Sequence, residues 1–199
     1  MYMKRRMVAR KLMCLIALIF LCTSALPAGQ VRLGLKFFGL SVHPQGVIHE
    51  ELMPLKLDPD GYVVLNLGGT LNAEYYIWKD IVSVKLVQGF YADCAMQPAG
   101  FTHIGLRGRI FQSGRHSLNG GIGPTWIYRG AWKKLDGYQV APGEFFKNTT
   151  QDGNWEWNFV FYGGEFEYNY QIAEGLDISF SLIPSPQLTN ISVGVSYRI

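Results

Sequence analysis

Apolar and polar residues alternate with a period of two over long stretches of this chain. Between residues 188 and 199, Thr189, Ile191, Val193, Val195, Tyr197 and Ile199 alternate with Asn190, Ser192, Gly194, Ser196 and Arg198. Successive side chains of a β-strand point to opposite faces, so this pattern predicts a strand with one apolar face. Eight such segments can be recognised, at approximately 31–42, 61–76, 80–92, 100–112, 115–129, 156–172, 176–183 and 188–199.

A soluble β-sandwich and a membrane-spanning β-barrel can both produce this alternation, but the segment lengths favour the barrel. Most segments reach the roughly 10 residues of a tilted membrane crossing, whereas strands of soluble proteins usually have about 5–6 residues. Aromatic residues also gather near the segment ends, as they do in the two girdles of a barrel. They are Tyr75, Tyr76, Trp78, Phe90, Tyr91, Trp126, Tyr128, Trp155 and Trp157.

The connections alternate in length, which is typical of outer-membrane barrels. Residues 43–60 and 130–155 form long connections, whereas 78–79, 113–114 and 173–175 form tight turns. We therefore predict an all-β fold, an eight-stranded antiparallel transmembrane β-barrel with up-and-down topology. Pro124 falls inside the fifth segment and predicts a bulge or kink there, beside Gly121 and Gly123.

The beginning of the chain has the pattern of an export signal. Residues 1–11 include five basic and no acidic residues, and an unbroken run of eleven apolar residues follows at 12–22. As a helix this run spans only about 16 Å, too short for a hydrocarbon core of about 30 Å. We expect residues 1–28 to be a signal peptide and 29–199 to be an outer-membrane β-barrel domain of a Gram-negative-type cell. Cys22 also allows a lipoprotein, although Leu21 is larger than the residue that lipid attachment prefers.

Removing that segment changes the sign of the net charge. The whole chain has 18 Lys and Arg against 15 Asp and Glu, while residues 29–199 keep 13 against 15. The barrel domain is slightly acidic, so nothing in its charge supports binding to nucleic acid. Cys94 is its one cysteine and can form no disulfide within it.

Charged residues on the polar alternate set are expected to fill the barrel. An eight-stranded barrel is just wide enough for side chains to fill it, and buried charges need partners. These ten side chains should therefore pair into a plug, which argues against a solute pore and places any site at the rim or on the lipid-facing wall; a narrow ligand channel is the least favoured alternative. They are Arg32, Lys36, Glu74, Lys85, Arg107, Arg109, Glu156, Glu165, Glu167 and Asp177.

A serine and a histidine stand together at the outer end of the first segment. Ser41 and His43 are two residues apart and share the phase of Leu33, Leu35 and Phe37, which is predicted to face lipid. A serine beside a histidine is the minimum for an activated nucleophile when an acid orients the imidazole. Glu50, Glu51, Asp60 and Asp93 could supply that acid. The candidate catalytic set is Ser41, His43, Asp93 and His103.

Other interpretations of these residues remain open. Ser41 and His43 could simply end a strand that Pro44 stops. His43, His49 and His103 could bind zinc, but no close-spaced pair of ligands supports this, and no metal or other cofactor is assigned. Cys94 has no adjoining basic residue to lower its pKa, which predicts an inert thiol.

In size, export signal and strand number the chain resembles the outer-membrane lipid A 3-O-deacylases. Residues 114–118 (GRHSL), 121–123 (GIG) and 126–128 (WIY) are similar to one strand of that family. The resemblance implies a lipid A acyl-ester hydrolase, with the membrane and the lipopolysaccharide of its outer leaflet as partners. The family has a His-x-Ser-Asn motif near its C-terminus, whereas residues 179–184 (SFSLIP) contain no histidine. No catalytic residue can therefore be carried over.

The alternative function is a non-catalytic structural or adhesive outer-membrane barrel. In that case the aromatic residues of the connection 130–155 are expected to contact a partner. They are Trp132, Tyr138, Phe145, Phe146 and Trp155. The oligomeric state is left open.

Overall fold

The computed structural model of the chain describes residues 30–44, 49–139, 145–184 and 188–199. The expected signal peptide, residues 1–28, lies outside the described residues and stays a prediction. Within the described part of the chain, no helix has the length and apolar character that crossing a membrane requires.

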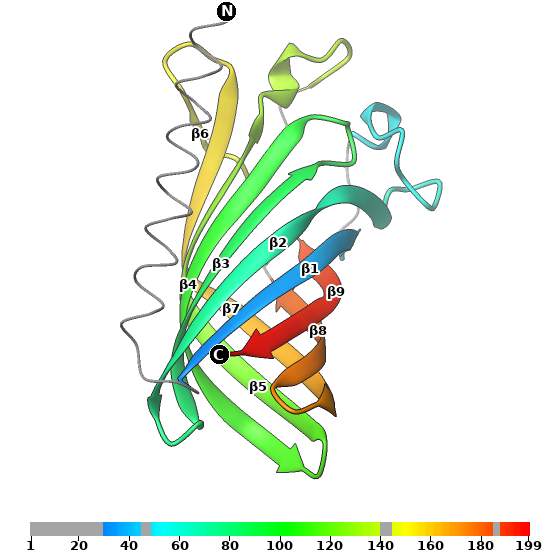
Figure 1. Cartoon of the computed structure of the whole chain (residues 1–199). Helices are drawn as coiled ribbons and strands as arrows, with labels where there is room; N and C mark the ends of the chain where they lie inside the picture. The colour runs from blue at the N-terminus through cyan, green and yellow to red at the C-terminus, as the bar shows by residue number, and fades with distance from the viewer. Residues whose placement is uncertain (1–29, 45–48, 140–144, 185–187) are drawn as a thin grey trace, which may run out of the picture.

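Eight long antiparallel strands form the body of the molecule (Figure 1). Each pairs with the next along the chain, β1 also pairs with β9, and β5 pairs with β7, so the sheet closes on itself. A two-residue strand, β6 (Asn148–Thr149), runs along the start of β7. The predicted eight-stranded up-and-down barrel is confirmed. The barrel strands are β1 (Val31–Val42), β2 (Val63–Trp78), β3 (Val82–Ala92), β4 (Pro98–Ser113), β5 (His116–Gly130), β7 (Trp155–Ala173), β8 (Leu176–Pro184) and β9 (Thr189–Arg198).

The two ends of the barrel differ in their connections, as predicted. Three tight turns join β2 to β3, β4 to β5 and β7 to β8. Gly114 and Gly175 take positive φ angles of 52° and 70° in two of them, a conformation that glycine adopts without steric cost. The opposite end carries the longer connections, with the short 3-10 helices η1 (Glu50–Leu52) and η2 (Trp132–Lys134). These are called the turn end and the loop end below.

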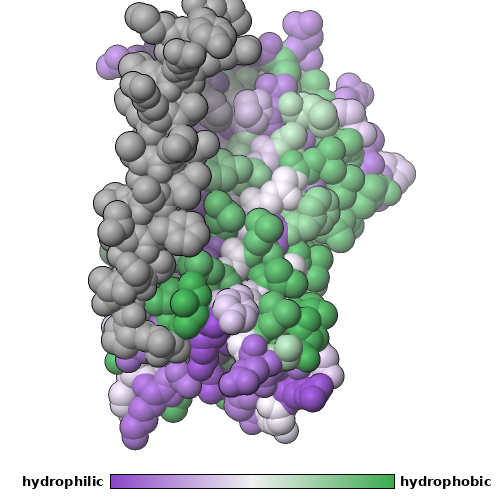
Figure 2. Space-filling view, in the orientation of Figure 1, coloured by the Kyte–Doolittle hydropathy of each residue, from purple (hydrophilic) through white to green (hydrophobic). Residues whose placement is uncertain are grey.

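A belt of large apolar side chains faces outward around the barrel wall. Figure 2 shows part of it as a hydrophobic zone across the visible face, with hydrophilic residues below it. An outward apolar band is the surface that contacts hydrocarbon in a transmembrane β-barrel. Each barrel strand contributes exposed members, among them Leu35, Leu71, Leu86, Leu106, Ile122, Phe166, Phe180 and Val195.

Inside the barrel, three cations converge on one carboxylate. Glu167 accepts hydrogen bonds from Lys36, from Lys85 at 2.6 Å and from Arg107 at 2.7 Å. Lys85 also donates to Glu165, and the guanidinium of Arg107 lies 3.3 Å from Glu74. All of these side chains are buried. Three positive and three negative charges therefore neutralise one another in the middle of the barrel, as the predicted plug requires.

Two smaller ion pairs lie on either side of this network. Arg32 binds Asp177 at 2.8 Å nearer the turn end, and Arg129 binds Glu156 at 3.0 Å at the loop end. Arg109, the tenth residue of the predicted plug, is half-buried and forms no ion pair with a described residue. The predicted interior set is thus largely confirmed, with nine of its ten members paired.

Irregular pairing at Pro124 changes which side chains of β7 point out of the barrel. The register between β5 and β7 shifts between Gly123 and Thr125, so the pairing is irregular at Pro124 as predicted, but the bulged residue lies on β7 and not on β5. Proline has no N–H to donate to the ladder, and β7 carries the additional residue. Consequently, the consecutive residues Phe161 and Tyr162 both point outward, with 62% and 74% of their surface exposed.

Replacing the central carboxylate should strongly destabilise the barrel. In Glu167→Gln, the cations of Lys36, Lys85 and Arg107 lose their shared counter-charge while they stay buried. The free energy of unfolding, measured by urea titration in lipid vesicles, should fall by about 3–5 kcal/mol. The matched control is Glu174→Gln in the exposed turn between β7 and β8, which should change it by less than about 0.5 kcal/mol. Equal losses in the two variants would contradict a central role for Glu167.

Candidate functional site

Ser41 lies inside the barrel and not on the lipid-facing wall, contrary to the phase read from the sequence. The register of β1 shifts between Phe38 and Leu40 against both of its neighbours. Against β9 the additional residue is Gly39, and the side chains of β1 change face after it, so Ser41 is only 1% exposed. Its hydroxyl donates to Asn190 at 2.8 Å and accepts from Asn66 at 2.6 Å. Ser41 therefore links β1 to β9 and β2.

His43 follows the end of β1 and is held by the backbone of the next connection. Its main-chain N–H donates to the carbonyl of Tyr62 at 2.7 Å, and its ring Nδ1 lies 3.1 Å from the carbonyl oxygen of Gly61. Burial lowers the pKa of the imidazole. No hydrogen bond joins His43 to Ser41 among the described residues.

Asp93 organises the tight connection between β3 and β4. Its carboxylate accepts the N–H groups of Ala95 at 3.0 Å and Gln97 at 2.8 Å, and the indole N–H of Trp132 at 2.7 Å. Burial raises the pKa of Asp93 in spite of these donors. Asp93 thus joins the β3–β4 connection to η2.

His103 faces the barrel interior from β4 and is fully buried. Its Nδ1 lies 2.7 Å from the hydroxyl of Thr125 on β5. The four predicted catalytic residues therefore belong to separate groups of contacts, and no hydrogen bond between described residues connects any two of them. Their catalytic role stays a prediction.

The described residues contain no cluster of three or more His, Cys, Asp or Glu side chains that could hold a metal ion. His49, one of the three histidines considered for zinc, stacks on the ring of Tyr138 with 4.4 Å between centroids. His103 faces the interior instead. The geometry thus gives no support to a zinc site built from these histidines.

Aromatic residues of the long connection after β5 point into the molecule and form a cap over the loop end. Trp132 is only 3% exposed and packs in an apolar cluster with Met53, Val64, Cys94 and Ala95. The cap comprises this cluster and its partly buried neighbours Leu55, Leu135 and Tyr138. The expectation that Trp132 is displayed to a partner is therefore wrong, because its ring and its N–H group are both used within the fold.

Arg129 fastens this cap to the barrel. Its guanidinium lies 4.1 Å from the ring centroids of both Trp132 and Phe146, in addition to its ion pair with Glu156. Cation–π contacts of this kind are stronger when the partners are removed from water. Phe145 and Phe146 also pack against the interior apolar cluster below, which comprises Phe38, Val87, Phe101, Ile127 and Ile183.

Among the described residues, much of the loop-end half of β7 has a partner strand on one side only. β8 pairs with β7 only from Phe166 to Ala173, and β6 reaches only Glu156 and Trp157. In the described part of the chain, residues 158–165 of β7 therefore pair on one side only, with β5. β8 ends at Pro184, which lacks the N–H group that a longer ladder would use.

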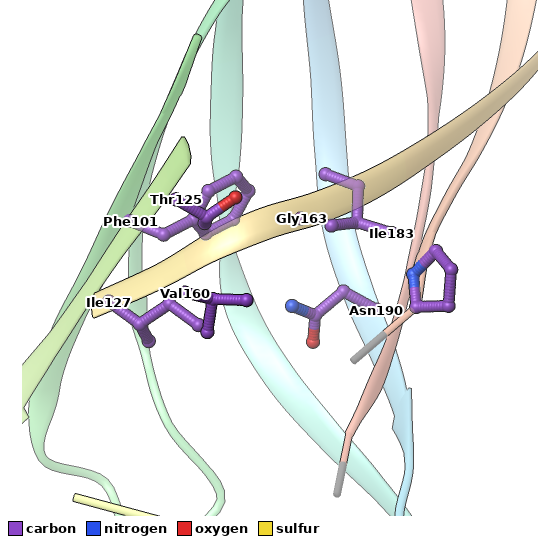
Figure 3. A pocket seen from close by; sticks show the side chains of 8 residues that line it. Phe101, Thr125, Ile127, Val160, Gly163, Ile183 and Asn190 are labelled. Atoms are coloured by element: carbon purple, nitrogen blue, oxygen red, sulfur yellow. The ribbon is translucent and has the colours of Figure 1, made fainter. Parts of the chain in front are cut away.

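A small pocket, the wall pocket, lies beside this stretch of β7 (Figure 3). Its lining includes Val160 and Gly163 of β7, Ile183 and Pro184 of β8, and Asn190 of β9. Its inner lining is formed by Phe101, Thr125 and Ile127. Because Phe101, Ile127 and Ile183 belong to the interior apolar cluster, the pocket borders that cluster.

Two of the predicted catalytic residues stand directly behind the wall pocket without lining it. Ser41 contacts it through Asn190, and His103 through Thr125. The pocket itself does not follow from the alternation of apolar and polar residues. Its signals were the short segment 176–183 beside the much longer 156–172, the glycine pair Gly163 and Gly164, and Pro184.

No family model matches the chain, and no curated protein matches it in sequence. Similar solved structures include Ail of Yersinia pestis in complex with the heparin analogue sucrose octasulfate (13% identity, 87% of this chain and 100% of that chain covered, TM-score 0.47). They also include OprG from Pseudomonas aeruginosa (14% identity, 86% of this chain and 96% of that chain covered, TM-score 0.46). Neisserial surface protein A is a third (10% identity, 86% of this chain and 98% of that chain covered, TM-score 0.47). At such identities no residue's role carries over to this chain, and nothing here supports the lipid A deacylase family beyond the shared barrel.

The cap should shield Cys94 from alkylation. Burial raises the pKa of the Cys94 thiol to about 12, so very little reactive thiolate forms at pH 8. Removing the indole in Trp132→Ala should open the cluster and speed iodoacetamide labelling of Cys94, followed by peptide mass spectrometry, about tenfold or more. The matched control is Trp155→Ala, because Trp155 lies at the exposed start of β7. Labelling at the same rate in wild type and Trp132→Ala would show that the cap does not protect this thiol.

Proposed function

We propose that the chain is a non-catalytic barrel of the outer membrane, which holds a fixed platform of connections at its loop end. The observation that carries this proposal is the use of the candidate catalytic side chains in structural contacts. Ser41, Asp93 and His103 each bond to neighbours that hold strands or connections together. A nucleophile needs a base within hydrogen-bond reach, and Ser41 has two asparagines there instead.

The filled interior argues against transport of solutes along the barrel axis. The network around Glu167 occupies the middle of the barrel, the interior apolar cluster follows it, and the cap lies beyond both. A water-filled channel would need this neutral network to be taken apart, which would leave buried charges without partners.

Outer-membrane residence is supported by the closed sheet and by the export signal predicted at residues 1–28. Closed barrels and helices are the structures that satisfy every backbone group in lipid. In this setting the turn end is expected to face the periplasm and the loop end the cell exterior. The exposed surface of the loop end would then be the part available to another molecule.

The competing function is hydrolysis of an acyl ester of lipid A by Ser41, His43, Asp93 and His103. One observation favours it, since Ser41 and His103 both stand one hydrogen bond behind the wall pocket. In that mechanism the Ser41 hydroxyl would have to leave Asn190 and transfer its proton to an imidazole.

Mass spectrometry of lipid A should separate the two functions. Cells with the wild-type protein and cells without it should show the same acylation pattern. The proposal of a non-catalytic barrel fails if the wild type removes an acyl chain while Ser41→Ala and His43→Ala do not. Both variants should be checked for the heat-dependent gel shift of a folded barrel, so that a loss of folding is not taken for a loss of activity.

A further inference from the structure

We propose that the outer wall of β3, β4, β5 and β7 binds a phosphorylated glycolipid near the loop end. This goes beyond the proposed function, because it assigns a lipid partner to the wall of the barrel. It rests on one part of that function, the placement of the loop end at the cell exterior, where the wall meets the outer leaflet. The surface, called the aromatic face, comprises the outward side chains of Gln88, Thr102, Trp126, Tyr128, Trp155 and Trp157.

The rings of the aromatic face lie close together across β5 and β7. The ring centroid of Tyr128 lies 5.5 Å from that of Trp126 and 6.2 Å from that of Trp155. Trp126 and Trp157 meet edge to face, with 6.5 Å between centroids. Trp126 and Trp155 remain 48% and 38% exposed, so parts of their rings are open to a molecule outside the barrel.

The aromatic side chains are confined to this side of the loop end. At the corresponding outward positions of β1, β2, β8 and β9, the ladder places the aliphatic side chains of Leu40, Leu65, Leu182 and Ile191. A girdle that only positions a barrel in the bilayer would be expected on all sides. The uneven distribution therefore points to a partner bound on one side.

A hydrogen-bonded polar group lies within the aromatic face. The Nε2 atom of Gln88 donates to the Tyr128 hydroxyl at 3.0 Å, and Oε1 of Gln88 accepts from Thr102 at 2.7 Å. Opposite Tyr128 stands Gly100, where a Cβ would lie 2.6 Å from the Tyr128 hydroxyl, so glycine makes room for the tyrosine side chain to lie along the wall. Because its oxygen accepts from Gln88, the Tyr128 hydroxyl keeps its own hydrogen to donate.

The three outward indoles are further donors. Within the described chain, the N–H groups of Trp126, Trp155 and Trp157 have no hydrogen-bond acceptor. Tryptophan is enriched at membrane interfaces, where its ring contacts apolar groups and its N–H meets polar ones. The aromatic face thus offers donors without acceptors, which suits the phosphate and ester oxygens of a lipid.

Exposed lysines stand beside the start of β7, next to the aromatic face. Lys133 donates to Thr149 of β6 at 2.8 Å, and Lys134 donates to Asn154, the residue before β7. Lys147 directly precedes β6. None of the three forms an ion pair with a described residue. Basic side chains at a membrane surface attract anionic lipids.

These features together favour a glycolipid that carries phosphate. The connection has two acids, Asp136 and Asp152, against its three lysines in the described ranges 131–139 and 145–154, so its charge there is positive. Aromatic faces carry negative charge density, which attracts the C–H groups of a sugar ring. The apolar belt toward the turn end, with Ile122 and Phe159, would contact the acyl chains. An anionic phospholipid without a sugar would use the lysines but not the exposed rings.

The indole N–H signals in two-dimensional NMR test the proposal. The purified protein carries isotope-labelled tryptophan, is folded into phosphatidylcholine nanodiscs and is titrated with lipid A, a phosphorylated glycolipid. The signals of Trp126, Trp155 and Trp157 should shift and saturate. The other two tryptophans are internal controls, because Trp132 is buried in the cap and Trp78 lies at the turn end. Phosphatidylglycerol, added to the same total charge, should shift the three signals far less.

Removing one hydroxyl should weaken this binding. In Tyr128→Phe the affinity for lipid A should fall about threefold to tenfold, because one hydrogen bond to the lipid is lost. The matched control is Tyr197→Phe, which removes the same group from an exposed outward position of β9 at the turn end. That variant should bind lipid A as the wild type does.

Removing one positive charge gives an independent test at an exposed position. In Lys147→Gln the affinity for lipid A should fall about fivefold, because a cation near the lipid phosphate is lost. The matched control is Lys56→Gln in the connection between β1 and β2, where Lys56 donates to the carbonyl of Pro59. Mass spectrometry of the titrated lipid A shows whether it stays intact, so binding is separated from hydrolysis.

Three outcomes would overturn the proposal. The first is a shift of the Trp78 signal as large as those of the aromatic face, which would indicate a general change of the bilayer. The second is an equal response to phosphatidylglycerol and lipid A, which would indicate attraction of anionic lipids without recognition of a sugar. The third is that Tyr128→Phe and Lys147→Gln bind lipid A as tightly as their matched controls.

Discussion

The structure depends on the neutralisation of charge around Glu167. Charged groups inside an apolar wall are costly unless each has a partner, and the cost grows as water is excluded. Here the carboxylate of Glu167 binds Lys36, Lys85 and Arg107. The carboxylates of Glu74 and Glu165 neutralise the other two positive charges. Because the cations come from β1, β3 and β4 while Glu167 comes from β7, the network links β7 across the interior to strands with which it does not pair.

Above this network the interior changes character toward the loop end. Phe38 follows Lys36 by two residues on β1, and Val87 follows Lys85 by two on β3, so the same inward face turns from charged to apolar. Arg129, Phe146 and Trp132 then join that apolar layer to the cap. The connections at the loop end are consequently part of the folded core.

The fold could be predicted largely from the sequence, because period-two alternation over long segments is a local signal. All eight strands were predicted in this way, and the irregular pairing at Pro124 was predicted from the proline itself. The candidate site was less accessible, because a single additional residue at Gly39 reverses the facing of Ser41 and leaves no mark on composition. The packing of Trp132 against Asp93 joins residues 39 positions apart, and alternation says nothing about such contacts between connections.

The wall pocket was hidden for a different reason. It arises because the neighbouring strands β7 and β8 differ in length, and the sequence of each strand looks regular when it is read alone. The signals were present in Pro184 and in the unequal lengths of β7 and β8, but their meaning depends on which strands are neighbours and in what register. That information comes only from the closed sheet.

The unequal strands also bear on the bilayer itself. β7 has 19 residues, whereas β8 has 9 and β9 has 10. At about 3.4 Å per residue and a tilt of about 40°, nine residues rise only about 23 Å, less than the apolar band of about 25 Å typical of such barrels. The barrel is therefore lower on the β8–β9 side, and hydrophobic mismatch should thin the surrounding leaflet there. Lipids beside that low side would be the least well ordered of those around the protein.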